Sequence, residues 1–410
     1  MAEDGSFEMA QTFDFSFETV KAVTLKLLAY CKQNAFSGHD PYDALNSKLL
    51  AYFSVLNRRF PRLALTQFLK RSPLNFRHLL LIPKTENPKA IALFLMAFLR
   101  LRELRLLDAD PLIHLLIEKL INLRSLHESN GSNNSYWCWG YSFPWQTRTI
   151  FVPRGAPNLV CTTFVANALL EAYETLGEIR CLDMAASAAR YIVDELYWTD
   201  GESTASLSYP TPSSRARTHN ANFMGAALLH RVYNHCGGEK LLHSSMRVAR
   251  YSASQQHEDG SWHYGDHSTQ RWIDNFHTGY NLCALNDIGR YAETSEFESY
   301  VRRGFAFYRH NFFREDGAPK YYHNRVFPID IHCVAQSIIT LTVFRNLDET
   351  GFNLAHTVFR WAMANMWDDE GYFFYQALPL IKIRTSYMRW SQAWMLLALS
   401  ALLQESSKNS

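Results

Sequence analysis

Two short segments of the chain place a carboxylate next to a histidine. Asp274 stands three residues before His277, and Asp330 stands two residues before His332. Two carboxylates across a cavity can act as general acid and as base or nucleophile on a glycosidic bond. A carboxylate beside a histidine can instead orient the imidazole for proton transfer. Each aspartate can also be no more than the N-cap of a helix, because Asp is a preferred residue there.

Both segments belong to a repeat that must position these side chains. At five places a loop rich in glycine and aromatic residues runs into an apolar helix. By subtraction of positions, the junctions lie 57, 57, 55 and 57 residues apart. Regular spacing of this kind is typical of repeat architectures. The residues at equivalent junctions are Thr163, Asn220, His277, His332 and Arg389.

Each unit reads as a helix, an aromatic loop, a second helix and a short return turn. Residues 1–130 repeat less cleanly, but helical patterns over 45–56, 90–106 and 111–126 predict the hairpins that complete a ring. We therefore predict an all-α fold, an (α/α)6 barrel or toroid of about 56-residue hairpins. We expect one domain over 1–410, with five clear hairpin repeats in 131–405. An open α-solenoid is the alternative, although its loops are usually shorter and less aromatic.

In such a toroid the inner helices begin around one mouth of a central funnel. Three of them carry polar residues four positions apart, on one helix face. Capping explains the first member of each pair but not the second, so the pairs predict a polar-lined cavity. The pairs are Thr163 with Asn167, His277 with Asn281, and His332 with Gln336.

Aromatic and basic residues in the loops and at the helix starts complete the predicted site. Tyr322 is a candidate base beside the two aspartates and two histidines. Rings can stack on sugars, and arginines can bind a carboxylate, sulfate or phosphate. Packing of the loops and structural ion pairs are the competing explanations. The candidate substrate-binding residues are Trp139, Trp145, Arg148, His219, Asn220, Trp262, Asn281, Tyr321, Arg325, Gln336, Tyr387, Arg389 and Trp390.

Composition excludes several functional classes. The net charge of +2 is too small to suggest a nucleic-acid partner. The seven cysteines form no CxxC pair, and several lie in apolar helices, so we expect free thiols in a reducing compartment. Residues 1–15 do not resemble a signal peptide, and no apolar run is long enough to cross a bilayer. We expect a cytoplasmic protein without a cofactor or metal, because no histidine spacing is diagnostic of a metal site.

Several longer motifs resemble a bacterial family whose members occur with exopolysaccharide and capsule biosynthesis genes. The resemblance covers about residues 28–403. Its clearest motifs are Trp-Gly-Tyr-Ser-Phe-Pro-Trp-Gln-Thr-Arg at 139–148 and Trp-Ile-Asp-Asn-Phe-His-Thr-Gly-Tyr-Asn at 272–281. Further matches lie at residues 40–48, 70–75, 319–324, 328–332 and 387–394. At a broader level the chain resembles the six-hairpin carbohydrate enzymes, which include glycoside hydrolases, polysaccharide lyases and sugar epimerases.

These resemblances imply a carbohydrate-active enzyme of exopolysaccharide biosynthesis with an oligosaccharide or sugar-conjugate substrate. Glycoside hydrolysis by the aspartate pair is the first expectation. A uronate or sugar epimerase, or a lyase, with a His or Tyr base and an Arg is the alternative. A glycan-binding protein without activity is a third. Residues 255–262 also resemble a motif of terpene cyclases and prenyltransferases, which share an α-toroid, but the acidic cyclase motif is missing. The oligomeric state stays open.

Overall fold

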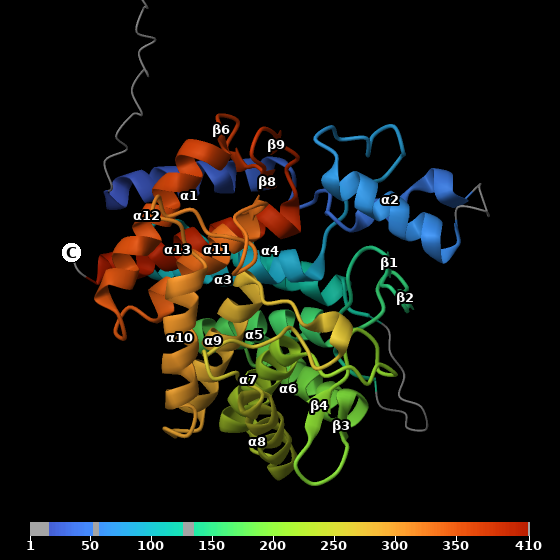
Figure 1. Ribbon diagram of the computed structural model, residues 1–410, viewed down its shortest axis with the longest axis vertical. Helices are drawn as coiled ribbons and strands as arrows, with labels where there is room; N and C mark the ends of the chain where they lie inside the picture. Colours follow the sequence, from blue (N-terminus) through green and yellow to red (C-terminus); the bar gives the residue numbers. More distant parts are fainter. Residues whose placement is uncertain (1–15, 52–56, 126–134, 409–410) are drawn as a thin grey trace, which may run out of the picture.

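The computed structural model describes residues 16–51, 57–125 and 135–408 of the chain. Within these residues six helices form an inner ring, in which each helix packs against the next and the last packs against the first (Figure 1). The predicted α/α toroid is therefore confirmed. The inner helices are α3 (Pro88–Glu103), α5 (Leu159–Leu176), α7 (His219–Cys236), α9 (Asn275–Tyr291), α11 (Ile331–Val343) and α13 (Ala393–Ser407).

Six outer helices pack against the ring, one against each inner helix. Five of them follow their inner partner through a short turn, such as the one at Gly177, which ends α5 in the left-handed conformation that glycine favours. In chain order these five are α4 (Asp110–Asn122), α6 (Ile179–Tyr191), α8 (Glu239–Ser254), α10 (Glu298–Asn311) and α12 (Glu349–Met366).

The sixth outer helix comes from the other end of the chain. Helix α1 (Phe17–Gln33) packs against α13, and Figure 1 shows the blue and red ends of the chain side by side. The region before residue 131 thus supplies one complete hairpin, α3–α4, and the outer half of another. The ring closes only where the two ends of the described chain meet.

The predicted helix over 45–56 is wrong in the part that the structure describes. Residues Asp43–Asn46 and Lys48–Ala51 form short 3-10 turns, and residues 52–56 lie outside the described part of the chain. Helix α2 (Arg59–Arg71) follows and stands outside the ring. The described residues 40–51 and 57–71, which include the two turns and α2, are called the flap below.

Long loops join each outer helix to the next inner helix and carry short strands. These pair in small antiparallel ribbons within the described residues, apart from one three-stranded sheet in the order β5-β8-β9. The strands are β1 (Trp145–Gln146), β2 (Phe151–Val152), β3 (Tyr197–Thr199), β4 (Ala205–Leu207), β5 (Ile329–Asp330), β6 (Trp367–Asp368), β7 (Tyr372–Phe373), β8 (Gln376–Ala377) and β9 (Lys382–Ile383).

The inner helices are apolar nearly all round, because they contact neighbours on both sides as well as an outer helix. In α3 every residue from Pro88 to Leu99 is buried. Neighbouring inner helices also approach closely, as at Gly279 of α9. A Cβ built there would lie 2.7 Å from Cγ of Gln336 on α11. None of the helices in the described part of the chain is both long and apolar enough to span a membrane.

Candidate active site

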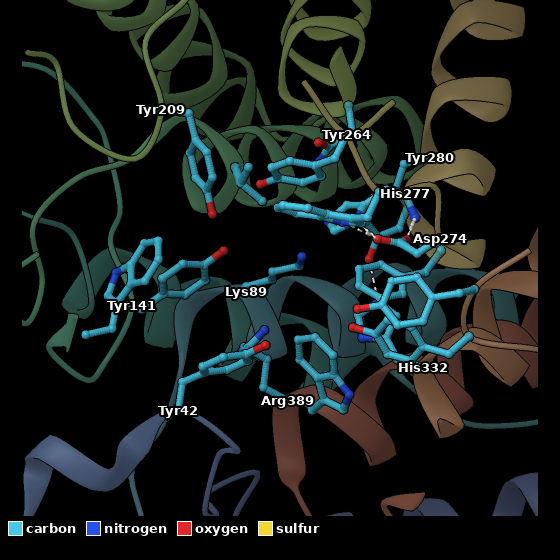
Figure 2. A pocket seen from close by; sticks show the side chains of 18 of the residues that line it. Tyr42, Lys89, Tyr141, Tyr209, Tyr264, Asp274, His277, Tyr280, His332 and Arg389 are labelled. Atoms are coloured by element: carbon cyan, nitrogen blue, oxygen red, sulfur yellow. Dashed lines mark hydrogen bonds and ion pairs between the residues drawn. The ribbon is translucent and has the colours of Figure 1, made fainter. Parts of the chain in front are cut away.

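A cavity of about 280 Å³ opens where the inner helices begin (Figure 2). Because all six helices start there, the positive ends of their dipoles converge on it. Loop aromatics form most of the remaining wall. The second or third residue of each helical segment lines the cavity: Lys89 in α3, Val160 in α5, Asn220 in α7, His277 in α9, His332 in α11 and Arg389 in the π-helical turn Met388–Gln392 that leads into α13.

Asp274 and His277 form a hydrogen-bonded dyad on the cavity wall. Asp274 caps α9, and its Oδ1 accepts from the backbone N–H of His277 at 3.0 Å. Its Oδ2 lies 2.7 Å from Nδ1 of His277 and accepts from Nε1 of Trp272 at 3.0 Å. A carboxylate only accepts, so Nδ1 carries the hydrogen and the neutral ring has its lone pair on Nε2. The dyad therefore presents a general base, held in one tautomer, at the cavity.

His332 is a second imidazole at the cavity, in a different environment. It is 1% exposed, and its Nε2 lies 2.5 Å from the hydroxyl of Tyr280. Burial, with the nearby charges of Lys89 and Arg389, lowers the pKa of His332 well below its usual value. The ring is therefore neutral at neutral pH. Burial also raises the pKa of Tyr280 well above its usual value, so its hydroxyl keeps its proton.

The two imidazoles both lie against one phenylalanine. The ring of Phe276 has its centroid 4.1 Å from that of His277 and 4.7 Å from that of His332. His277 also lies 5.9 Å, between centroids, from Tyr280. Two proton-carrying groups, the Asp274–His277 dyad and the Tyr280–His332 pair, therefore share one cavity.

Asp330 lies behind the wall and does not line the cavity. Its Oδ1 accepts from the backbone N–H of His332 and from Nε1 of Trp390, both at 2.9 Å, and its Oδ2 accepts from Nε2 of Gln376 at 2.7 Å. The side chain is fully buried, and this burial raises the pKa of its carboxyl. Of the two aspartates, only Asp274 reaches the cavity.

Arg389 and Lys89 bring two basic side chains to the cavity. Arg389 is buried and forms a two-point ion pair with Asp40 of the flap, with Nε and Nη2 at 2.6 and 2.8 Å from the carboxylate oxygens. Lys89 is 4% exposed, and its ammonium lies over the ring of Phe164 at 4.0 Å. Burial and the charge of Arg389 lower the pKa of Lys89 well below its usual value.

The structure brings part of the predicted set together at this cavity and holds the rest elsewhere. Beside the residues already placed, the predicted residues that line the cavity are Trp145, Asn220, Tyr321, Tyr322 and Trp390. Trp139, Trp262 and Tyr387 are fully buried in the core, and Asn281 is buried and lines a separate small pocket with Asn220 and Asp274. His219 is buried and pairs with Asp266 at 3.0 Å. Arg148 and Arg325 are exposed. The guanidinium of Arg325 lies over the ring of Tyr322, 4.1 Å from its centroid.

Thr163 and Gln336 face a second cavity at the opposite end of the ring. This cavity of about 450 Å³ is lined by the later turns of the inner helices. Phe164, Tyr280 and Trp394 lie in its wall, and the Lys89 ammonium lies on the rings of the same three residues. These rings therefore separate Lys89 from the second cavity.

Sequence reasoning missed Lys89 and several rings of the wall. A signal for Lys89 exists, because Asn87 and Pro88 are typical of a helix start. The side chain of Asn87 accepts from the backbone N–H of Lys89 at 3.1 Å. The missed aromatic residues come mostly from the loops and are Tyr42, Tyr141, Phe143, Tyr209, Trp272, Phe276 and Tyr280.

Comparison with known proteins identifies the fold. No family model matches the sequence, and no curated protein is significantly similar to it. Among solved structures, a cellobiose 2-epimerase from Spirochaeta thermophila shares 13% identity at a TM-score of 0.59. The match covers 79% of this chain and 87% of the epimerase chain. A family 76 α-mannanase from Bacteroides thetaiotaomicron shares 9% identity at a TM-score of 0.59, with 80% and 88% covered. An unsaturated glucuronyl hydrolase specific for heparin shares 10% identity at a TM-score of 0.60, with 96% and 98% covered.

The molecule therefore has the fold of the six-hairpin toroid enzymes, as the sequence predicted. At these identities the likeness shows the fold alone.

Proposed function

We propose that this protein is a carbohydrate-active enzyme that moves a proton on a sugar, as an epimerase does. The Asp274–His277 dyad carries the proposal, because it presents an oriented base to an aromatic cavity. Hydrolysis normally uses two carboxyl groups, about 5–10 Å apart, that both face the glycosidic bond. Asp330 is held behind the wall by three hydrogen bonds, which favours the epimerase over the hydrolase expectation.

The reaction begins with a sugar in its open-chain form, in which the hydrogen on C2 lies next to a carbonyl group. Nε2 of His277 takes the C2 proton, and the electron pair moves to form an enediolate with its charge on O1. A proton supplied from the Tyr280–His332 pair to the other face of C2 gives the epimer. Proton exchange with water then restores His277 and Tyr280. Among the structural neighbours, cellobiose 2-epimerase is named for this type of conversion.

The test is deuterium exchange at C2, a signal that can be followed whichever product forms. Neutral and acidic reducing sugars are incubated with the protein in D2O, and loss of the C2 proton signal is followed by NMR. We expect exchange with wild type, and its loss in His277→Gln. His267→Gln, an exposed histidine on the loop before α9, is the matched control and should exchange normally.

Two results would refute the proposal. One is exchange by His277→Gln at the wild-type rate. The other is release of new reducing ends from oligosaccharides that depends on both Asp274 and Asp330, which would establish the hydrolase instead.

We also propose that the enzyme serves exopolysaccharide assembly in the cytoplasm, where a free reducing sugar would be its substrate. The motif resemblance at residues 139–148 and 272–281 supports this role. Deleting the coding sequence should change the sugar composition of the cell's polysaccharide, and His277→Gln should not restore it. An unchanged polysaccharide in the deletion strain would refute the role.

A further inference from the structure

Lys89 is a buried lysine at the cavity, with no carboxylate of the described chain in contact with its Nζ. Among the described residues, no ion pair or side-chain hydrogen bond involves its ammonium. The group lies over aromatic faces instead, 4.0 Å from the centroid of Phe164, 5.2 Å from Trp394 and 5.6 Å from Tyr280. A buried charge is costly unless it is paired. Such a side chain is suited to an anion that arrives with the ligand.

The acids near the cavity are already used. Asp40 is bound to both Nε and Nη2 of Arg389. Asp274 has its two oxygens occupied by His277 and Trp272. Because these carboxylates are bound to other partners, none of them forms an ion pair with Lys89.

Hydroxyl donors surround the same space. Lys70 of the flap donates from Nζ to the hydroxyl oxygen of Tyr42 at 2.7 Å. Since that oxygen already accepts, the O–H of Tyr42 is available to donate into the cavity. The hydroxyl groups of Tyr141 and Tyr209 face the same space and can also donate to a ligand. Figure 2 shows Tyr42, Tyr141, Tyr209 and Lys89 directed into one space.

We propose that the cavity binds an acidic sugar, whose carboxylate or phosphate lies on Lys89 and accepts hydrogen bonds from Tyr42, Tyr141 and Tyr209. This inference names the substrate class of the proposed epimerase and rests on that function. The aromatic wall would hold the sugar ring, while the ammonium and phenols hold its oxyanion group. An ammonium with hydroxyl donors is a strong set for an oxyanion, because charge-assisted hydrogen bonds are about twice as strong as neutral ones.

Binding measurements test the inference without relying on turnover. Titration calorimetry with glucose, glucuronate and glucose 6-phosphate should show tighter binding of an acidic sugar to wild type, by about ten- to hundredfold. Preference for glucuronate identifies a carboxylate subsite, and preference for glucose 6-phosphate identifies a phosphate subsite. Lys89→Met should lose the preference and keep the affinity for glucose. Lys89→Arg should retain part of the preference for the acidic sugar. Lys240 is exposed, so Lys240→Met should retain the whole preference.

Several results would overturn the inference. Equal affinity of wild type for the three sugars would do so, as would a preference that persists in Lys89→Met. Borohydride trapping of a reducing sugar on Lys89 would show a neutral amine that forms an imine and loses water, which is a different role. Folding of each variant is checked by circular dichroism, and Lys89→Arg still tests the charge if Lys89→Met does not fold.

The two proposals can fail separately. Acidic sugars that bind in a Lys89-dependent manner but exchange no deuterium would refute the epimerase and leave the subsite standing. Exchange on acidic sugars at the rate found for neutral sugars, with no change in Lys89→Met, would refute the subsite and leave the epimerase standing.

The acid preference should also depend on pH. Burial and the charge of Arg389 lower the pKa of Lys89, while Cys161 and Asp40 act in the opposite direction. His332 also faces this group and is neutral. Because only the ammonium form attracts an anion, the preference should be lost as pH rises through the pKa of Lys89. A preference that grows with rising pH would contradict the assignment.

Discussion

Replacing Asp274 by Asn separates the catalytic role of this carboxyl from its structural role. Asn is as good an N-cap as Asp, so the amide oxygen can still accept from the backbone N–H of His277. The amide NH2 then takes the place of Oδ2, where it faces Nε1–H of Trp272 and Nδ1 of His277. It can donate to Nδ1 only if that nitrogen has no hydrogen. The hydrogen of the neutral ring therefore moves to Nε2, and the base is lost from the cavity.

The size of both effects follows from these contacts. The N–H of Trp272 loses its acceptor, and an unsatisfied buried donor costs about 1–3 kcal/mol of folding free energy. The rate of C2 deuterium exchange should fall by about 10²–10⁴-fold, the usual contribution of an oriented general base. Thermal unfolding measures the first effect, and NMR in D2O measures the second. A small loss of stability with a large loss of exchange is the expected combination.

Asp330→Asn is the matched control, because Asp330 caps the next inner helix in the same way. Its amide oxygen can keep the bonds to the backbone of His332 and to Trp390. Its NH2 then meets the side-chain amide of Gln376, which can rotate to present its oxygen. The His332 ring bonds to Tyr280 rather than to Asp330, so exchange should stay close to the wild-type rate. Equal loss of exchange in the two variants, or full activity of Asp274→Asn, would refute the dyad.

Three further predictions concern stability, and each is checked by chemical or thermal unfolding. Asp40→Asn should cost about 3–5 kcal/mol, because it leaves the buried Arg389 without its partner; a loss below about 1 kcal/mol would contradict this. Gly279→Ala should cost about 1–3 kcal/mol, since its Cβ would lie 2.7 Å from Cγ of Gln336; unchanged stability would mean that α9 and α11 separate easily. Lys89→Met should equal or exceed wild type in stability. The folded wild type binds fewer protons than the unfolded chain between the two pKa values of Lys89, so its stability rises with pH there, and this rise should shrink in the variant.

The repeat spacing located most of the helix positions that form the cavity. Asn220, His277, His332 and Arg389 all line it, and all four are junction residues of the repeat. Thr163 does not, because α5 begins at Leu159 and the cavity residue is Val160, three positions earlier. A shift of this size is invisible in the spacing, since loops of slightly different length absorb it.

The loops were less predictable than the helices. An aromatic residue in a loop can face the cavity, as Trp145 does, or fill the core beneath the loop, as Trp139 and Trp262 do. Both outcomes bury a large apolar ring, so residue type alone does not distinguish them. The role of Asp330 also depended on neighbours far along the chain, because Gln376 supplies one of its hydrogen bonds from β8.

Because α1 packs against α13, the first and last helices of the described chain lie side by side in the ring. These two helices form one of the six inner–outer pairs. In the other five pairs a return turn joins the two helices, and the cavity residues lie at the opposite ends of the inner helices. Joining the existing ends through a linker and opening the chain at Gly237–Gly238, between α7 and α8, would therefore give the same ring in a new chain order. Such a circular permutant should retain the cavity, and each return turn offers a site where a second protein could be fused without touching the site.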